Sequence, residues 1–293
     1  MKPRDYSGPA DLAAMQRIVQ RAWNPDSHWH IGDLAWQRPS MPDRTIALWD
    51  EAAWAWFSAG NGLEMAAPPE LVGAVLAWFD EMAGDDEKSV TVMETDAAAI
   101  DGLTAAGYRP AQTTTFFRHC LRELDDTLPA PQITAGYQVR SVRPGELAAR
   151  AAVHRAAWQL KRLGEMQVPP VDLGEGGSGM TTARYGEIIG HWPYRSDLDL
   201  VVEAPDGSLV GSALGWIDDV NHVALLEPVG VDPEHGRRGL GAAVSLACLH
   251  AMRAAGATLA VVCPRGDDAY PVPRRLYHAV GFHDAGRTVT YQR

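Results

Sequence analysis

Residues 229–243 read Val-Gly-Val-Asp-Pro-Glu-His-Gly-Arg-Arg-Gly-Leu-Gly-Ala-Ala, and this stretch decides how the rest of the chain is interpreted. The apolar start is typical of a strand, the Gly-rich middle of a turn, and the sequence from Leu240 onward of a long helix. Backbone N–H groups at a helix N-terminus attract anions, and glycines let an anion approach the main chain. Arg237 and Arg238 add forked donors that suit phosphate oxygens. The stretch predicts a pyrophosphate site; the alternative is an ordinary Gly-rich loop with solvated arginines.

A second motif follows at Leu276-Tyr-His-Ala-Val-Gly-Phe282. Together the two motifs resemble the GNAT superfamily of acyl-CoA N-acyltransferases, whose strand-to-helix loop follows the pattern Arg/Gln-x-x-Gly-x-Gly/Ala and whose later helix carries Leu-Tyr-x-x-x-Gly-Phe. Gly239 and Gly241 match the last two fixed positions of the loop, whereas Gly236 stands where the family has Arg or Gln. The resemblance is specific over residues 198–293 and weak before residue 137.

The resemblance implies acetyl-CoA as co-substrate and direct attack of an amine on the thioester, with no covalent enzyme intermediate and no metal. It implies that the strand before the loop pairs with the pantetheine arm and that Tyr277 protonates the departing thiolate, a task its phenol can perform. Ten residues are expected to bind the coenzyme: Val229, Gly230, Val231, Gly236, Arg237, Arg238, Gly239, Leu240, Gly241 and Ala242.

The general base is expected to be Glu227, on the strand that leads into the loop. It lies four residues before Val231 and so shares its face in an unbroken strand, although Pro228 could introduce a bulge. Burial would raise the pKa of this carboxyl into a useful range. The alternative is a carboxylate that only attracts or orients a cationic substrate. An acidic, aromatic mouth for a cation is expected at Trp216, Asp218 and Asp219, although Asp pairs more often form polar turns.

The chain contains an internal repeat. Residues 10–23 align without gaps on residues 145–158, an offset of 135 positions. Both halves then show paired strands, a Pro-Glu step, an Ala-rich helix, a short apolar strand, a helix and a Gly-aromatic pair. After Pro69 the first half enters its helix with no Gly-x-Gly, and Leu103 stands where the tyrosine is expected. We therefore interpret the first half as a degenerate copy that is structural or walls the substrate cleft.

These patterns predict an α+β protein with two tandem GNAT-like domains, each a central mixed, mostly antiparallel sheet flanked by helices. The degenerate domain is expected at residues 1–124, a linker at 125–134 and the catalytic domain at 135–293. The second half has about 29 extra residues between Trp158 and Leu198. We interpret this insert as a mobile loop over the site, or as surface decoration.

Composition narrows the classes of function. A net charge of −11 argues against a nonspecific nucleic-acid binder and suits a cationic substrate. No apolar run is long enough for a membrane span and the start of the chain has no signal-peptide pattern, so a cytoplasmic protein is expected. The three cysteines are expected to be buried free thiols. His28 and His30 with Asp33 do not make a metal shell by themselves, and no metal is expected.

The sequence therefore predicts an N-acetyltransferase that acts on a primary amine of a small, cationic metabolite or antibiotic, as a monomer or homodimer. One alternative is a protein or peptide N-acetyltransferase, which would need an open groove for a peptide. Another is a sensor that binds acyl-CoA without turnover. The preference for a small cation rests on acidity and on an expected cleft between the domains.

Overall fold

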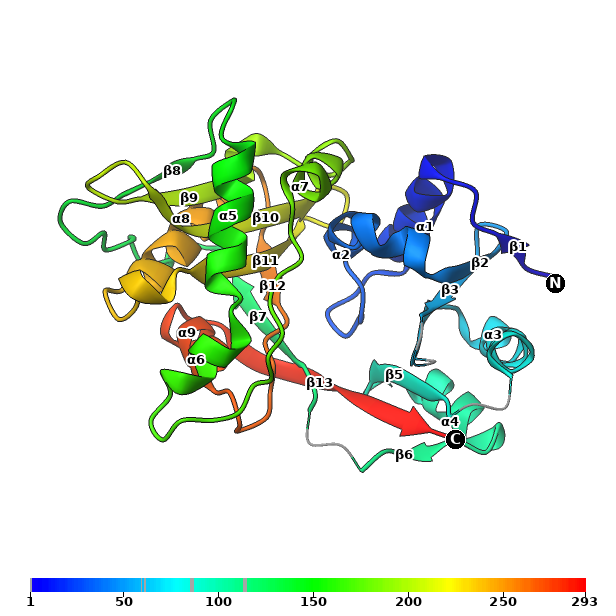
Figure 1. Ribbon diagram of the computed structural model, residues 1–293. Coiled ribbons are helices and arrows are strands. Elements are labelled where there is room, and N and C mark those ends of the chain that lie inside the picture. Colours follow the sequence, from blue (N-terminus) through cyan, green and yellow to red (C-terminus); the bar gives the residue numbers. More distant parts are fainter. Residues whose placement is uncertain (1, 59, 61, 85–86, 113–114) are drawn as a thin grey trace. The chain divides into compact units, whose positions relative to one another are not determined.

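The computed structural model describes residues 2–58, 60, 62–84, 87–112 and 115–293 (Figure 1). Its internal contacts divide the chain into two units. Unit 1 comprises Met1–His119 with Ala285–Arg293, and unit 2 comprises Cys120–Asp284. Each unit is a mixed sheet with helices packed on it, which confirms the predicted α+β class.

The sheet of unit 2 has the order β8-β9-β10-β11-β12-β7. Every neighbouring pair is antiparallel except β11 and β12, which are parallel and joined by helix α8. The strands are β7 (Arg118–Glu123), β8 (Gln138–Ser141), β9 (Asp199–Glu203), β10 (Leu209–Asp218), β11 (Val223–Val231) and β12 (Leu259–Val262). The turn Pro205-Asp206-Gly207 joins β9 to β10, with Gly207 N–H donating to Ala204 O.

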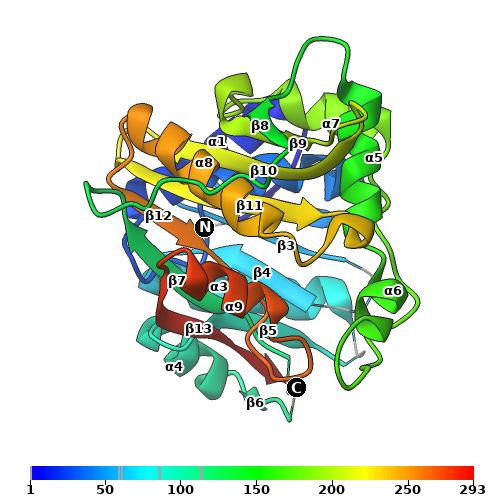
Figure 2. The same cartoon turned by 90° about the vertical axis from the view of Figure 1, so that its left-hand side faces the viewer.

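Helices cover both faces of this sheet. Figure 1 shows α5 crossing strands β9 to β11, and Figure 2 shows α8 and α9 over β11 and β12. A Cβ atom on Gly230 would come within 2.6 Å of Ala157 in α5, whereas one on Gly215 would come within 2.7 Å of Met252 in α8. The helices of unit 2 are α5 (Leu147–Ala157), α6 (Leu160–Glu165), α7 (Thr182–Ile189), α8 (Leu240–Ala254) and α9 (Val272–Ala279).

Unit 1 repeats this plan with the sheet order β1-β2-β3-β4-β5-β13, and β4 and β5 are again the parallel pair, joined by α3. Its strands are β1 (Arg4–Asp5), β2 (Thr45–Trp49), β3 (Ala53–Phe57), β4 (Gly62–Ala66), β5 (Ser89–Met93), β6 (Arg109–Pro110) and most of β13 (His283–Gln292). Its helices are α1 (Pro9–Ala22), α2 (Ile31–Trp36), α3 (Pro69–Ala83) and α4 (Ala97–Ala105).

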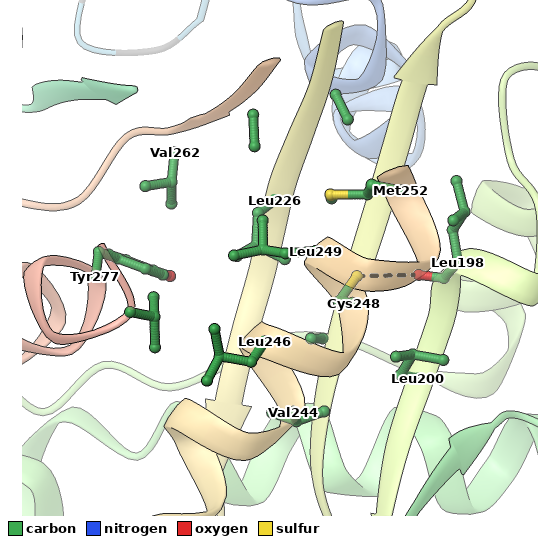
Figure 3. Packing of buried hydrophobic residues seen from close by; sticks show 14 of the residues in the cluster. Leu198, Leu200, Leu226, Val244, Leu246, Cys248, Leu249, Met252, Val262 and Tyr277 are labelled. Atoms are coloured by element: carbon green, nitrogen blue, oxygen red, sulfur yellow. Dashed lines mark hydrogen bonds between the residues drawn. The ribbon is translucent and has the colours of Figure 1, made fainter. Parts of the chain in front are cut away.

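The central strands are apolar on both faces because both faces are covered. In β3, Trp54 and Trp56 join the cluster that contains α1 and α2, while Ala55 and Phe57 join the cluster that contains α3. Most tryptophans of the first half are therefore core residues. Figure 3 shows the corresponding cluster of unit 2, where Cys248 of α8 lies among leucines.

The last strand of each sequence half belongs to the sheet of the other unit. Cys120–Glu123 of β7 pair with β12 in unit 2, and Thr288–Gln292 of β13 pair with β5 in unit 1. The expected linker, residues 125–134, consequently lies inside unit 2. The predicted domains 1–124 and 135–293 follow the two halves of the sequence, and as domain boundaries they stay a prediction.

The insert of the second half contains α6, α7 and the short 3₁₀ turn Ser196–Leu198, so it is not one long loop. Arg162 of α6 forms an ion pair with Glu234, in the first part of the Gly-rich turn, with an N–O distance of 3.1 Å. Within the residues that the structure describes, no helix has the length and apolar character to cross a membrane.

Candidate functional site

The Gly-rich turn forms an anion nest at the start of α8. The turn consists of a 3₁₀ segment, Pro233–His235, and residues 236–239. Gly239 is left-handed (φ 74°) and stands immediately before the helix, as the sequence predicts. The first intrahelical bond recorded there runs from Ala243 N to Gly239 O, so the N–H groups of residues 240–242 remain available. Among the residues that the structure describes, no side chain caps this end of the helix.

Two arginines flank the nest. Arg237 (φ 56°) and Arg238 are exposed, and neither guanidinium forms a hydrogen bond or ion pair with any described residue. Both can therefore turn toward an anion without breaking an existing contact. Positive charge at the positive end of a helix 15 residues long favours a polyanion such as a diphosphate.

The strand that leads to the nest has an open edge. β11 pairs with β12 only through Val223, Ala224 and Leu225, and no described strand pairs with that edge beyond them. On its other side β11 pairs with β10 to its end, where Asp232 N–H donates to Val210 O at 2.8 Å. Because antiparallel bonding alternates, the N–H and C=O groups of Val229 and Val231 face the open edge. An extended ligand could pair with them as an added strand.

Glu227 lies at a β-bulge. Glu227 and Pro228 of β11 stand opposite the single residue Leu214 of β10. The strand is therefore not unbroken, and the four-residue spacing from Glu227 to Val231 cannot assign the face of the carboxyl. Trp216 holds the bulge by donating its indole N–H to the Glu227 carbonyl at 2.7 Å.

The Glu227 carboxyl is suited to accept a proton near neutral pH. Burial raises its pKa to about 7, while the residue as a whole is only half-buried. A group with this pKa is partly ionised at neutral pH and returns its proton readily. The half-buried position leaves a path for that proton.

Tyr277 of α9 is buried, with 7% of its surface exposed, and packs edge-on against Phe282 with ring centroids 5.8 Å apart. In Figure 3 its ring points from α9 toward β11. Burial, and next the negative charge of Glu227, raise the pKa of the phenol above its usual range. The structure thus brings Glu227 and Tyr277 together. The Tyr277 hydroxyl forms no hydrogen bond with any described residue.

Three further residues near Tyr277 were not assigned a role from the sequence. Charges on Cys263, Cys120 and Tyr270 also act on the pKa of Tyr277. Tyr270 stands seven residues before Tyr277, where the family often has Asn, and burial raises its pKa as well. That spacing was the signal by which the sequence could have indicated Tyr270. No sequence signal indicated Cys263, which directly follows β12.

The expected acidic, aromatic mouth does not fit the burial of its members. Trp216 and Asp218 are both 0% exposed. Asp218 accepts hydrogen bonds from the backbone of Val220 and Asn221 in the turn after β10, which is the structural alternative weighed above. Asp219, the remaining member, is exposed.

The first half lacks these features at the equivalent places. α3 begins at Pro69 with no left-handed glycine before it, and Leu103 is fully buried.

Unit 1 instead has a cavity of about 760 Å³, which the sequence analysis did not find. It is lined mainly by the ends of α1, β4 and β5 and by the segment before Trp29. His28 lines this cavity, and burial lowers its pKa to about 3. His30 and Asp33 cap helix α2.

The comparisons with known proteins agree with this geometry. Residues 179–282 match the model of the Acetyltransferase (GNAT) family. A curated protein from Thermobispora bispora, named mycothiol acetyltransferase, is 30% identical over 200 residues, which are 64% of this chain and 60% of that protein. The chain thus spans less than two thirds of that relative's length.

Solved structures share the fold at low identity. A tandem GNAT protein from the clavulanic acid biosynthesis pathway matches with a TM-score of 0.64 at 16% identity, covering 100% of this chain and 98% of that one. A GCN5-related N-acetyltransferase from Sphaerobacter thermophilus matches with a TM-score of 0.59 at 19% identity, covering 100% and 95%. The chain therefore contains a GNAT acetyltransferase domain and has the fold of a tandem GNAT protein.

Proposed function

We propose that this chain is an N-acetyltransferase that moves the acetyl group of acetyl-CoA to a primary amine of a small, cationic molecule, and that unit 2 carries the reaction. One observation carries the proposal. The open edge of β11 runs directly into the anion nest of α8, with Glu227 and Tyr277 close to each other beside it. An extended thioester that ends in a diphosphate matches this arrangement.

In the proposed complex, the diphosphate lies on the free N–H groups of residues 240–242 and between the two arginines. The pantetheine arm pairs with the open main-chain groups of Val229 and Val231. The thioester carbonyl then lies at the bulged end of the strand. There a strand N–H group, the best placed being that of Val229, donates to the oxygen as it becomes negative.

The acceptor amine arrives as an ammonium at neutral pH. Glu227 removes one proton and passes it to solvent, and the neutral amine attacks the thioester carbonyl. Collapse of the tetrahedral intermediate breaks the C–S bond. The Tyr277 hydroxyl gives its proton to the departing sulfur. The second proton of the nitrogen then replaces it on the tyrosine oxygen. Its raised pKa keeps the phenol protonated until the sulfur leaves.

The class of the acceptor is inferred from the charge of the chain and from the insert of the second half. The net charge of −11 favours a cation, and the insert between α5 and β9 is built of short helices and turns beside the Gly-rich turn. The name of the curated relative adds mycothiol-type acceptors to the compounds worth testing. Polyamines and aminoglycosides represent the cationic class.

The test is calorimetric titration of acetyl-CoA into the wild type and Gly239→Glu, followed by thiol release with a panel of amines. Gly239→Glu places a carboxylate in the nest and should abolish binding. Gly207→Glu is the matched control, because both glycines have positive φ (74° and 84°) and no atom within 4 Å of an added Cβ. The control should bind like the wild type. Absence of binding in the wild type would overturn the acetyltransferase proposal.

A further inference from the structure

Three side chains that can bind a metal ion converge in unit 2, close to Tyr277 but apart from the anion nest and the open edge of β11. Cys120 comes from β7, His278 from α9 and Asp284 from the start of β13, and their ligand atoms all lie within 4.8 Å of one another. His278 Nε2 lies 2.7 Å from Asp284 Oδ1, and Cys120 Sγ lies 3.4 Å from the same oxygen. Figure 2 shows these three elements side by side. No local sequence pattern links the three residues, which are 158 and 6 positions apart.

The donor set has a definite chemical preference. A thiolate, an imidazole and a carboxylate are the ligands that Zn²⁺ takes in proteins, and three protein ligands with a water complete a tetrahedron. The thiolate and the carboxylate together balance the charge of a divalent ion, which lowers the cost of placing it against a buried strand. Cys120 is fully buried, whereas the side chains of His278 and Asp284 are 43% and 35% exposed. The exposed side gives the ion an entry path.

We propose that Cys120, His278 and Asp284 form a Zn²⁺ site with a solvent molecule as its fourth ligand. On binding, the Cys120 thiol gives its proton to solvent, and the ion replaces the hydrogen bond between His278 and Asp284. The role proposed for the ion is structural, and it does not depend on acyl transfer.

The position of the site indicates a role in holding the fold. Cys120 is the first residue of unit 2 and Asp284 the last, so the ion clamps both points at which the chain enters and leaves this unit. His278 directly follows Tyr277, so the same ion anchors the C-terminal end of α9. An ion that binds only the folded chain raises its stability by mass action.

The experiment uses Co²⁺ as a visible substitute for Zn²⁺ in the full chain freed of metal with a chelator. We expect one Co²⁺ per chain, a thiolate-to-cobalt charge-transfer band in the near ultraviolet and strong visible bands typical of tetrahedral cobalt. Zn²⁺ should displace the Co²⁺ and abolish both. Cys120→Ser should lose the charge-transfer band, whereas Cys263→Ser, which changes another cysteine near Tyr277, should keep it.

His278→Gln and Asp284→Asn test the remaining ligands and decide the matter if Cys120→Ser does not fold. Each should weaken Co²⁺ binding by at least about tenfold, because even the loss of a residue that only hydrogen-bonds to a metal ligand lowers metal affinity by about that factor. His283→Gln, an exposed neighbour outside the cluster, should bind like the wild type. The proposal is overturned if the wild type shows no thiolate band, if that band survives in Cys120→Ser, or if His278→Gln and Asp284→Asn bind Co²⁺ normally.

Discussion

Units 1 and 2 share a scaffold and differ at one turn. At the start of each half, an acidic residue beside the first helix holds an arginine and a backbone N–H. Asp11 lies 2.6 Å from Arg4 and accepts from Ser7 N, and Glu146 lies 2.7 Å from Arg140 and accepts from Arg143 N. The two acidic residues are equivalent in the repeat, and in both cases the arginine lowers the pKa of the carboxyl to about 2.

The turn before the central helix is where the units diverge. Unit 2 reaches α8 through a left-handed glycine that leaves three N–H groups free, whereas unit 1 enters α3 at Pro69 after Pro68. Proline at a helix start fits the fold and removes a donor. The difference teaches that the scaffold needs the helix and the parallel strand pair, but not the nest. The candidate site therefore depends on this one turn, whereas the shared scaffold does not.

Glu227→Gln is the substitution expected to have the largest effect on this contrast. It should lower kcat by about 10³-fold, within the range for loss of a positioned base. The wild-type rate should rise with pH through about 7, because the base must be ionised, and the variant should lose that limb. Rates against pH at saturating acetyl-CoA provide the measurement. Glu64→Gln in β4 of unit 1, whose carboxylate accepts from Trp56, is the control that should leave the rate unchanged.

Tyr277→Phe should follow, with a fall in kcat of about 10²-fold and little change in the Kd for acetyl-CoA, because only the donor to the departing sulfur is lost. Single-turnover kinetics together with calorimetry separate these quantities. Tyr108→Phe in unit 1 removes another buried hydroxyl and should not affect the rate. A weaker Kd with an unchanged kcat in Tyr277→Phe would assign the residue to packing instead.

Replacing both Arg237 and Arg238 by Ala should weaken acetyl-CoA binding about tenfold, or about 1.4 kcal/mol, because two exposed charge-assisted contacts are removed. The loss should shrink at high ionic strength. S-acetylpantetheine, which has no diphosphate, should bind the variant and the wild type equally. An equal loss for both ligands would contradict the assignment of the arginines to the diphosphate.

Asp11→Asn in unit 1 and Glu146→Gln in unit 2 should have the smallest and most similar effects, each lowering the free energy of unfolding by about 1 kcal/mol. Because the folded pKa lies below the ordinary value, this stabilisation is present above about pH 4 and is lost as the pH falls toward 2. Urea unfolding at pH 7 and pH 3 measures the loss. Clearly unequal losses of unfolding free energy would show that the two ion pairs do not stabilise their units equally.

Much of the fold was accessible from local pattern. The helix predicted from Leu240 begins there, and the short apolar strand predicted after it is β12. The nest was also predictable, because a left-handed glycine before a helix is a property of a few consecutive residues. The base was harder to place. The bulge at Glu227 changes the side-chain phase, so the approach of its carboxyl to Tyr277 depended on the pairing of β11 with β10.

The sequence by itself determined the order of the elements, the resemblance to the GNAT superfamily and the Gly-rich turn that unit 2 has and unit 1 lacks. Only the tertiary structure decided the exchange of β7 and β13, the burial of Trp216 and the meeting of Cys120 with His278 and Asp284. Helix periodicity and turn geometry act over a few residues and are written in neighbouring positions. Which strand edge a segment joins depends on free energies summed over distant partners, and no short pattern records that sum.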